Sequence, residues 1–234
     1  MVTGGSRNLG AEICHTLATK GYSVIVHYHT SRREAEEVVE RCRLEGVDSL
    51  PLQADFLSSA SLEEFATSCL EQTNYSIGHL VNNVGLYASE PLLDSSEKLW
   101  HELWQANVVA PIALVRHLQA SLRKAQGTIT NVGVAGLGRA VANRYNPVYT
   151  MTKMALLQAT RSLAQELAVY GMRVNMVSPG HLDHSVDLER YRHALPMLRP
   201  GSSREVAQLI GYLMEPGASY ITGQNIEVAG GALL

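Results

Sequence analysis

The chain has 234 residues, 46% of them hydrophobic, which fits one α/β domain over residues 1–234 with a sizeable core. Its 19 Lys and Arg residues against 22 Asp and Glu residues give a net charge of -3, which argues against nucleic acid or an anionic membrane as a partner. The sequence contains no apolar run of about 18 residues, so no membrane span is predicted, and no signal-peptide pattern is expected at its N-terminus. The three cysteines are widely spaced, which favours reduced thiols and a cytoplasmic protein.

Apolar runs of strand length alternate with helical patterns along the chain. Helices are expected near residues 9–20, 32–45, 59–73, 95–123, 147–170 and 203–214. Strands are expected at residues 22–28, 49–53, 79–82, 128–132, 173–177 and 225–228, with Val2 in a nearly absent first strand. This order predicts a single doubly wound, Rossmann-like α/β domain: a parallel seven-stranded sheet with helices on both faces. Ligands of such sheets bind beyond the carboxyl ends of the strands.

A glycine-rich turn, TGGSRNLG at residues 3–10, leads directly into the first helical pattern. Glycine permits positive φ and close approach of the backbone, and a helix N-terminus offers free N–H groups to an anion. The turn is therefore suited to hold a pyrophosphate, although a plain tight turn would have the same composition. The candidate binding residues here are Gly4, Ser6, Arg7, Asn8 and Leu9.

The segment after the next strand has no Asp or Glu where an NAD-binding protein would hold the ribose 2′-hydroxyl. It offers hydroxyl and cationic groups instead, in the run His29, Thr30, Ser31 and Arg32. Such groups accept a 2′-phosphate, so NADP(H) is the favoured cofactor, with Arg7 as a second positive charge. The alternative is that Arg32 and its neighbour Arg33 are solvated helix residues that pair with glutamates one turn further on.

Ordered motifs across the whole chain resemble the short-chain dehydrogenase/reductase family. They are the TGGSRNLG turn, Asp55, the segment Asn82–Gly85, Asn107, Tyr149 with Lys153, Ser178–Gly180 and Ile221–Gly223. The resemblance implies that Asp55, with Phe56 beside it, contacts the adenine of the cofactor. It also implies a homo-oligomer, either a tetramer or a dimer. It places Asn83, Val84 and Gly85 along the cofactor. It places Pro179 and Gly180 near the nicotinamide.

Tyr149 and Lys153 are spaced i and i+4, so a helix places them on one face. A free Tyr has a pKa of about 10, and a neighbouring ammonium lowers it. The pair therefore predicts an acid or base that works near neutral pH, and the family resemblance gives Lys153 a further role at the ribose hydroxyls. The alternative is an ordinary surface Tyr and Lys one turn apart.

Asn107 is the third candidate catalytic residue. Pro111 follows it in a helical pattern, and because proline has no N–H, the carbonyl of Asn107 loses its helical donor and can hold a water. The family resemblance implies that an Asn at this place holds a water that links the catalytic Lys to solvent. The alternative is a simple kink without a proton relay.

The segment at residues 128–136 departs from the family pattern. The family usually places a Ser there to polarise the substrate carbonyl, but this chain has Gly133 or Val134, depending on the direction of counting. Neither side chain donates a hydrogen bond, and one positioned donor is worth on the order of 3 kcal/mol. Thr130, Asn131 or a water could substitute. A second departure is Asn8, where many relatives have Gly.

Two subgroups of the family resemble this chain. The segments HYHTS and YTMTK favour the pteridine and dihydromonapterin reductases, which reduce a C=N bond, whereas the TGGSR start and the YxxxK helix fit the 3-oxoacyl-carrier-protein reductases. We favour NADPH-dependent reduction of a pterin, with a keto substrate as the alternative. A non-catalytic NADP-binding sensor or relic is the third reading, because the Ser is missing. The polar segment 181–187 is interpreted as a substrate-covering loop, and no metal is expected there.

Overall fold

The computed structural model describes residues 1–74, 76–139, 141–186 and 188–232. Its strands are β1 (Val24–Tyr28), β2 (Ser49–Gln53), β3 (His79–Asn82), β4 (Thr128–Val132), β5 (Arg173–Pro179) and β6 (Asn225–Val228). All pairings between them are parallel, β1 with β2 and then β3, β4, β5 and β6 in that order. Each of the six expected strands is present, although the strand expected at residues 22–28 begins at Val24.

The residues around Val2 occupy the middle of the sheet, between β1 and β3. Val2 forms parallel bridges with both Val26 and Val81. Its N–H donates to the carbonyl of Ile25 (2.9 Å), and its carbonyl accepts from the N–H of His27 (3.1 Å). The expectation of seven strands is therefore corrected: the described residues form six strands, and a single bridging position joins the two groups.

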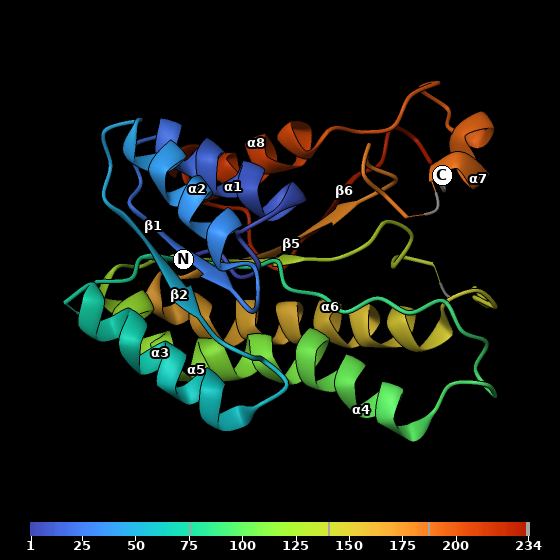
Figure 1. Cartoon of the computed structure of the whole chain (residues 1–234), viewed down its shortest axis with the longest axis horizontal. Coiled ribbons are helices and arrows are strands. Elements are labelled where there is room, and N and C mark those ends of the chain that lie inside the picture. The colour runs from blue at the N-terminus through green and yellow to red at the C-terminus, as the bar shows by residue number, and fades with distance from the viewer. Residues whose placement is uncertain (75, 140, 187, 233–234) are drawn as a thin grey trace.

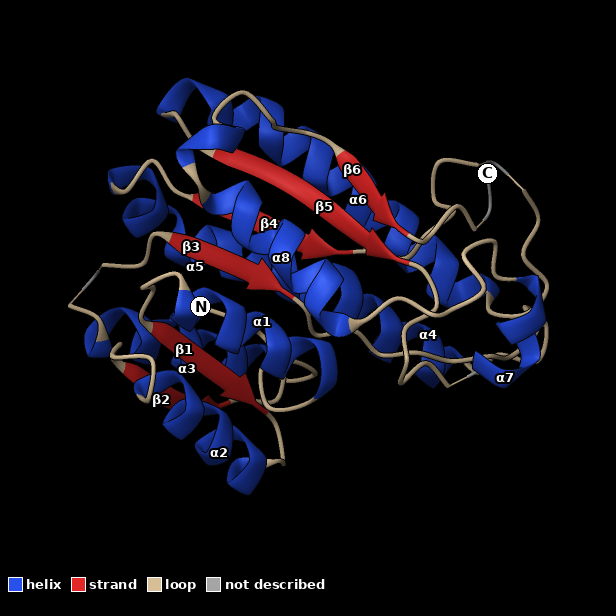
Figure 2. Cartoon of the chain, turned by 90° about the horizontal axis from the view of Figure 1, so that it is seen from above, coloured by secondary structure: helices blue, strands red, loops and turns tan. Residues whose placement is uncertain are grey.

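Helices cover both faces of the sheet (Figures 1 and 2). One face carries α1 (Asn8–Thr19), α2 (Arg32–Arg43) and α8 (Ser203–Met214), and the other carries α3 (Ser59–Gln72), α5 (Ala110–Lys124) and α6 (Pro147–Leu167). Shorter helical elements are α4 (Glu97–Trp104), α7 (Leu188–Tyr191) and 3-10 turns at Ala168–Tyr170, Arg192–Ala194 and Pro216–Ala218. A buried apolar cluster lies on each face, around Ile13 and Ile210 on one and around Leu80 and Leu118 on the other. The fold is thus Rossmann-like and doubly wound.

The helix expected over residues 95–123 is divided in three. α4 ends at Trp104, a π-helical turn follows at Gln105–Val109, and α5 begins at Ala110. Pro111 is the physical reason, because it cannot donate to the carbonyl one α-turn before it. A wider turn at this place sets Asn107 into the interior, where it is fully buried.

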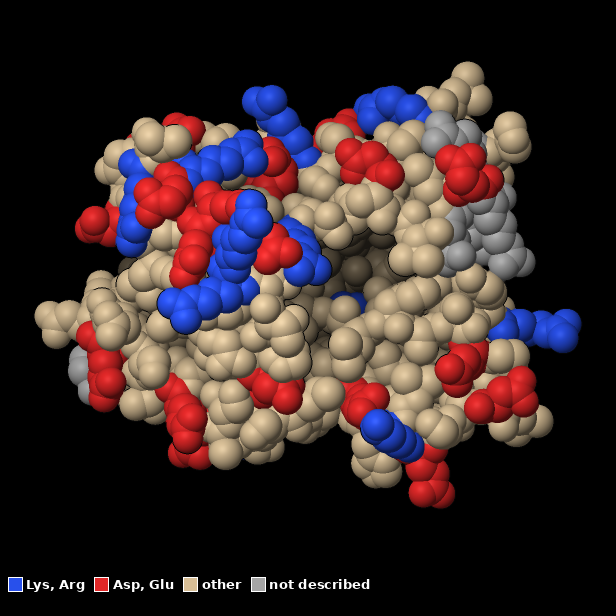
Figure 3. All heavy atoms as spheres, in the orientation of Figure 1, with Lys and Arg blue, Asp and Glu red and all other residues tan. Residues whose placement is uncertain are grey.

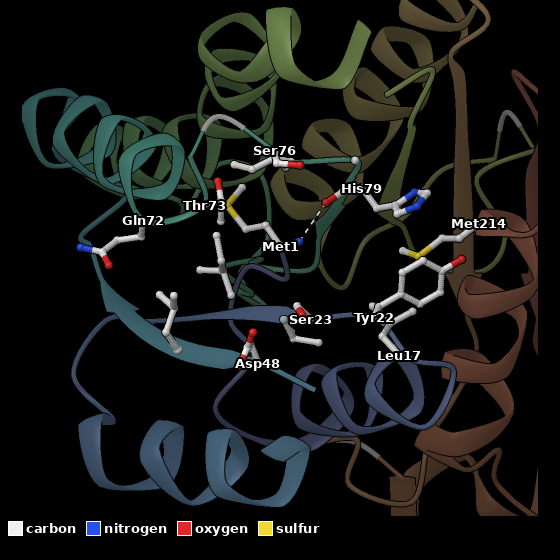
Figure 4. A pocket seen from close by; sticks show the side chains of 15 residues that line it. Met1, Leu17, Tyr22, Ser23, Asp48, Gln72, Thr73, Ser76, His79 and Met214 are labelled. Atoms are coloured by element: carbon white, nitrogen blue, oxygen red, sulfur yellow. Dashed lines mark hydrogen bonds between the residues drawn. The ribbon is translucent and has the colours of Figure 1, made fainter. Parts of the chain in front are cut away.

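A cavity of about 490 Å³ opens at the amino ends of the strands; we name it the amino-end cavity. Figure 4 shows that Met1 lies across it and that its ammonium donates to the carbonyl of His79, at 2.8 Å. Burial lowers the pKa of this ammonium below its usual value. The side chains that line the amino-end cavity include Leu17, Tyr22, Gln72 and Met214.

Cys14, Cys42 and Cys69 are buried free thiols inside the two apolar clusters. Among the described residues, no helix combines the length and the apolar character needed to cross a membrane.

Candidate active site

The Gly-rich turn follows Val2, the residue that bridges β1 and β3, and lies at the carboxyl ends of the strands, where it is tightly packed. Gly4 has a φ of 61°, and a Cβ on Gly10 would lie 1.9 Å from the carbonyl oxygen of Gly4. Asn8 has a φ of 46°, a conformation that Asn adopts more readily than most residues with a side chain. This accounts for Asn at a place where the family usually has Gly. The turn brings the N-terminus of α1, with its free N–H groups, to the edge of the sheet.

The side chain of His27 holds the Gly-rich turn by a hydrogen bond to its backbone, a role that no sequence pattern indicated. Its Nδ1 accepts from the N–H of Gly4 at 2.9 Å, so its Nε2 carries the proton and donates to the carbonyl of Ala54 at 3.2 Å. Burial lowers the pKa of His27 to about 4, which keeps the ring neutral. A buried His in an apolar strand is the only signal that could have drawn attention to it.

Asn83 ties the turn to β3. Its Nδ2 donates to the carbonyls of Thr3 (3.0 Å) and Gly4 (3.1 Å). The hydroxyl of Thr3 accepts in return from the N–H groups of Asn83 (2.9 Å) and Val84 (3.0 Å). The structure therefore brings together the predicted cofactor residues of the first turn and of the segment after β3.

The cations expected at a 2′-phosphate do gather at one edge, but each faces a carboxylate. Arg7 pairs with Glu34 across the two loops, and Arg32 pairs with Glu36 at 2.8 Å within α2. The alternative of helix-surface ion pairs is thus realised for Arg32 and also for Arg33, which pairs with Glu37 at 3.0 Å. Figure 3 shows this mixed group of positive and negative side chains over α1 and α2, beside a hollow in the same face.

Two residues expected at the adenine differ in their placement. Asp55 is half-buried two residues beyond the end of β2, where its Oδ1 accepts from the N–H of Leu57 at 2.9 Å. The ring of Phe56 is buried and stacks on His27, with ring centroids 4.2 Å apart. Only the backbone of Phe56 is therefore available to a ligand.

Lys153 and Tyr149 lie on one face of α6, as their spacing predicted. The Nζ of Lys153 is buried and donates to the carbonyl of Val132 at 2.8 Å, and burial lowers the pKa of Lys153 to about 8. It lies 5.8 Å from the centroid of the Tyr149 ring. Burial and the neighbouring Tyr87 raise the pKa of Tyr149, opposite to the expected lowering. Because removal from water favours the uncharged form, Tyr149 is a neutral phenol that can donate a proton.

Asn107 lies behind this pair. Its Oδ1 accepts from the N–H of Leu86 (2.8 Å), and its Nδ2 donates to the carbonyl of Leu86 (2.9 Å) and to the hydroxyl of Thr152 (3.0 Å). Gly85 lies between Asn107 and Lys153, because a Cβ there would be 3.0 Å from Nζ and 3.7 Å from Oδ1. Two of the three side chains expected to be catalytic, Asn107 and Lys153, therefore meet beside Gly85. Tyr149 approaches this pair by its ring, whose centroid lies 5.8 Å from the Nζ of Lys153.

The position of the missing Ser falls on Val134. A Cβ on Gly133 would lie 2.3 Å from the hydroxyl oxygen of Ser178 and would point into the core. Val134 instead lines the cavity that also contains Tyr149. Neither suggested substitute reaches that cavity: Thr130 is buried, and the Nδ2 of Asn131 donates to Thr160 at 2.8 Å inside the core.

A cavity of about 560 Å³ lies at the carboxyl ends of the strands; we name it the carboxyl-end cavity. Its floor contains Gly133, Tyr149 and the segment Pro179–Gly180, all at ends of predicted elements. The predicted covering loop contributes His181, Leu182, Ser185 and Val186 to one side of this cavity. Beyond that loop, Ala194, Leu195 and Pro196 add further apolar side chains. A second cavity adjoins it and shares Tyr87, Asn146, Tyr149 and His181.

Comparison with known proteins identifies the class. Residues 4–232 match a family model described as enoyl-(acyl carrier protein) reductase. A 3-oxoacyl-(acyl-carrier-protein) reductase of Staphylococcus aureus is 32% identical over 240 residues, which cover 99% of this chain and 96% of that protein. A short-chain dehydrogenase of Burkholderia cenocepacia in complex with NADP has a TM-score of 0.93 and 28% identity, covering 100% of this chain and 96% of that one.

A further similar structure is a blue fluorescent protein from a metagenomic library in complex with NADPH. It has a TM-score of 0.91 and 29% identity, and the match covers 98% of this chain and 95% of that one. Together with the ordered motifs, these matches confirm the expected class: the chain belongs to the short-chain dehydrogenase/reductase family. Members of this family are oxidoreductases.

Proposed function

We propose that this chain is an NADPH-dependent reductase of a carbonyl group borne on an apolar chain. The observation that carries the proposal is the position of Tyr149, a neutral phenol in the wall of a largely apolar cavity, with the buried Lys153 beside it. An acid in such a cavity can protonate an oxygen that gains negative charge.

The residues at the carboxyl edge fit a dinucleotide. The carbonyl of Gly4 fills the space where a side chain at Gly10 would lie, so the Gly-rich turn packs directly on the start of α1. The free N–H groups at that helix N-terminus would meet a pyrophosphate. Residues of that turn would hold the pyrophosphate, and Asp55 would meet the adenine. Asn83–Gly85 and Pro179–Gly180 would lie along the remainder of the cofactor, and Lys153 would reach the ribose hydroxyls.

A preference for NADP(H) over NAD(H) is part of the proposal. Arg7, Ser31 and Arg32 would surround a 2′-phosphate, and no carboxylate replaces them directly after β1. Their exposed ion pairs are worth little, since surface salt bridges contribute about 0–1 kcal/mol, so a doubly charged phosphate can compete with Glu34 and Glu36.

The chain's own residues divide the work as follows. Tyr149 donates its proton to the carbonyl oxygen, and Lys153, as an ammonium, stabilises the phenolate that remains. Asn107 holds the π-helical turn against Gly85 and would position the water that returns a proton. The nicotinamide, when bound, supplies the hydride that reduces the carbonyl carbon.

A 3-oxoacyl thioester is the substrate class that we now place first. The relatives described above include a 3-oxoacyl-(acyl-carrier-protein) reductase, and their names mention no pterin. The apolar side chains that line the cavity also suit an acyl chain better than a flat polar ring with many hydrogen-bonding groups. The order of the two substrates favoured from sequence is therefore reversed.

The test is oxidation of NADPH by the purified protein with acetoacetyl thioester and 7,8-dihydropterin measured side by side. We expect turnover of the thioester and none of the pterin. Turnover of the pterin alone would restore the first substrate preference. Binding of NADPH without turnover of either would favour the non-catalytic sensor, whose motive is the missing Ser at Val134.

A homo-oligomer, a tetramer or a dimer, is also proposed. Val109, Met151 and Met154 on the helices of one face are each more than a third exposed, which would suit contact with a second copy. Light scattering during gel filtration measures this state directly.

A further inference from the structure

The proposed carbonyl reduction gains from a second hydrogen-bond donor besides Tyr149, and the side chain of Val134 does not supply one. The polar side chains that line both cavities together with Tyr149 are Tyr87, Asn146 and His181. Tyr87 and His181 each have a further partner within the structure. The hydrogen bonds of Asn146 therefore decide whether an unused donor faces these cavities.

The side-chain amide of Asn146 has a fixed orientation, which its neighbour Asn143 imposes. The Oδ1 of Asn143 accepts from the backbone N–H groups of Tyr145 (2.9 Å) and Asn146 (3.1 Å), so the Nδ2 of Asn143 is its donating end. That Nδ2 donates to the Oδ1 of Asn146 and to the hydroxyl of Thr150, the latter at 2.7 Å. The hydroxyl of Thr150 in turn donates to the Oδ1 of Asn146 at 3.1 Å. Two donors thus hold the oxygen of the Asn146 amide, which assigns the other end of that amide to Nδ2.

The Nδ2 of Asn146 lies close to the proposed acid. Asn146 is the N-cap residue of α6, three residues before Tyr149. Its Nδ2 donates to the hydroxyl oxygen of Tyr87 at 3.4 Å, and the ring of Tyr87 meets the ring of Tyr149 edge to face, with centroids 5.0 Å apart. An amide nitrogen carries two protons, and within the part of the chain that the structure describes the second proton has no acceptor. One N–H of Asn146 is therefore available to a ligand in the cavities that it lines.

We propose that the Nδ2 of Asn146 is the second hydrogen-bond donor to the substrate carbonyl oxygen, in place of the missing Ser, and that Asn143 positions it. This inference rests on the proposed carbonyl reduction. Tyr149 transfers its proton to the oxygen, which gains negative charge as the carbon is reduced, whereas Asn146 keeps both amide protons and only donates a hydrogen bond. The donor thus comes from the start of α6, the helix that also carries Tyr149 and Lys153, and not from the end of β4.

The test compares Asn146→Ala and Asn146→Asp with the wild type in NADPH-dependent reduction of acetoacetyl thioester. Loss of one donor to a developing oxyanion lowers kcat by roughly 100-fold or more, and we expect that loss in both variants with little change in KM or in NADPH affinity. Asn146→Asp keeps the size and the accepting oxygen of the side chain, so a purely structural role would leave its kcat unchanged. Gln208→Ala is the matched control, because it removes an exposed amide of α8 that lines neither cavity, and it should leave kcat unchanged.

Val134→Ser in the Asn146→Ala background should recover part of the lost kcat, because it restores a hydroxyl at the place of the missing Ser. Asn143→Ala should lower kcat less than Asn146→Ala does, since it removes only the positioning contact. Wild-type kcat in both Asn146 variants would overturn the inference while leaving the proposed reduction intact. The same result with a loss in Ser185→Ala would assign the donor to the covering loop, whose Ser185 lines the same cavity. A wild-type protein that turns over no keto substrate would overturn both proposals.

Discussion

The two ends of the sheet carry cavities of similar volume, about 560 Å³ at the carboxyl ends and about 490 Å³ at the amino ends, but their linings differ. The carboxyl-end cavity is lined by Tyr149, whose ring centroid lies 5.8 Å from the Nζ of Lys153, and by the segments that follow β4 and β5. The amino-end cavity contains the buried ammonium of Met1 and no such group of converging acid and ammonium side chains among the residues that line it (Figure 4).

This comparison shows that volume alone does not mark an active site. Parallel strands all deliver their following loops and helix N-termini to the same edge, so free N–H groups and mobile turns accumulate at the carboxyl ends. The amino-end cavity instead lies beside the single bridging position at Val2, where the central strand is short. We therefore expect changes at the carboxyl end to alter chemistry and changes at the amino end to alter stability.

The largest expected effect is at the carboxyl end. Tyr149→Phe removes the proposed proton donor, so kcat for the keto substrate should fall by roughly 1,000-fold, within the range of general acid catalysis. NADPH affinity should remain close to that of the wild type. Tyr22→Phe removes a phenol oxygen at the amino end and should leave kcat unchanged. Equal losses of kcat in both variants would contradict the assignment of chemistry to the carboxyl end alone.

One His near each end has a lowered pKa, the buried His27 and the half-buried His79, and acid should destabilise the fold through both. Burial lowers the pKa of His27 and of His79 to about 4, from 6.5. The folded state therefore binds fewer protons than the unfolded state between these values, so stability is complete above pH 6.5 and falls as the pH drops toward 4. For His27 the lowering of the pKa corresponds to about 3 kcal/mol.

Denaturant unfolding at pH 7 and pH 4.5 measures this loss, which His27→Gln and His79→Gln should each reduce. Only His27→Gln should also weaken NADPH binding at pH 7, because His27 accepts from the N–H of Gly4 in the turn. Weaker binding in His79→Gln would contradict the separation of the two ends.

Cofactor preference gives a smaller effect at the carboxyl end. Arg32→Ala should weaken NADPH binding by about tenfold, the effect of losing about 1.4 kcal/mol, and should change NADH binding little. Arg33→Ala is the matched control, because Arg33 pairs with Glu37 at 3.0 Å in the same way but is more exposed. Fluorescence titration with both nucleotides measures this, and equal losses for NADPH and NADH would rule out the 2′-phosphate role.

The smallest expected effect is at the amino end. The peptide groups of Ile25 in β1 and His79 in β3 face the place that Met1 and Val2 occupy between these strands. An engineered Val-Thr-Val extension ahead of Met1 should therefore pair with both β1 and β3 across the amino-end cavity. Each new hydrogen bond contributes about 1 kcal/mol, and thermal unfolding should show a higher Tm with unchanged kcat. An extension containing Pro, which lacks an N–H, is the control, and equal stabilisation by both would contradict pairing.

The sequence by itself determined the order of strands and helices, the Gly-rich turn and the shared face of Tyr149 and Lys153. Each of these depends on local spacing: apolar runs of strand length, glycines before a helix, and side chains one helical turn apart. The break in the long helix also followed from one residue, Pro111, although the π-helical form of the turn did not.

Only the tertiary structure decided which residues from distant segments meet. The ring contact between Tyr87 and Tyr149, the support of Gly4 by His27, and the assignment of the missing Ser to Val134 join residues that no spacing relates. Burial likewise reversed the expected direction of the Tyr149 pKa, because removal from water depends on everything packed around a group and not on its neighbours along the chain.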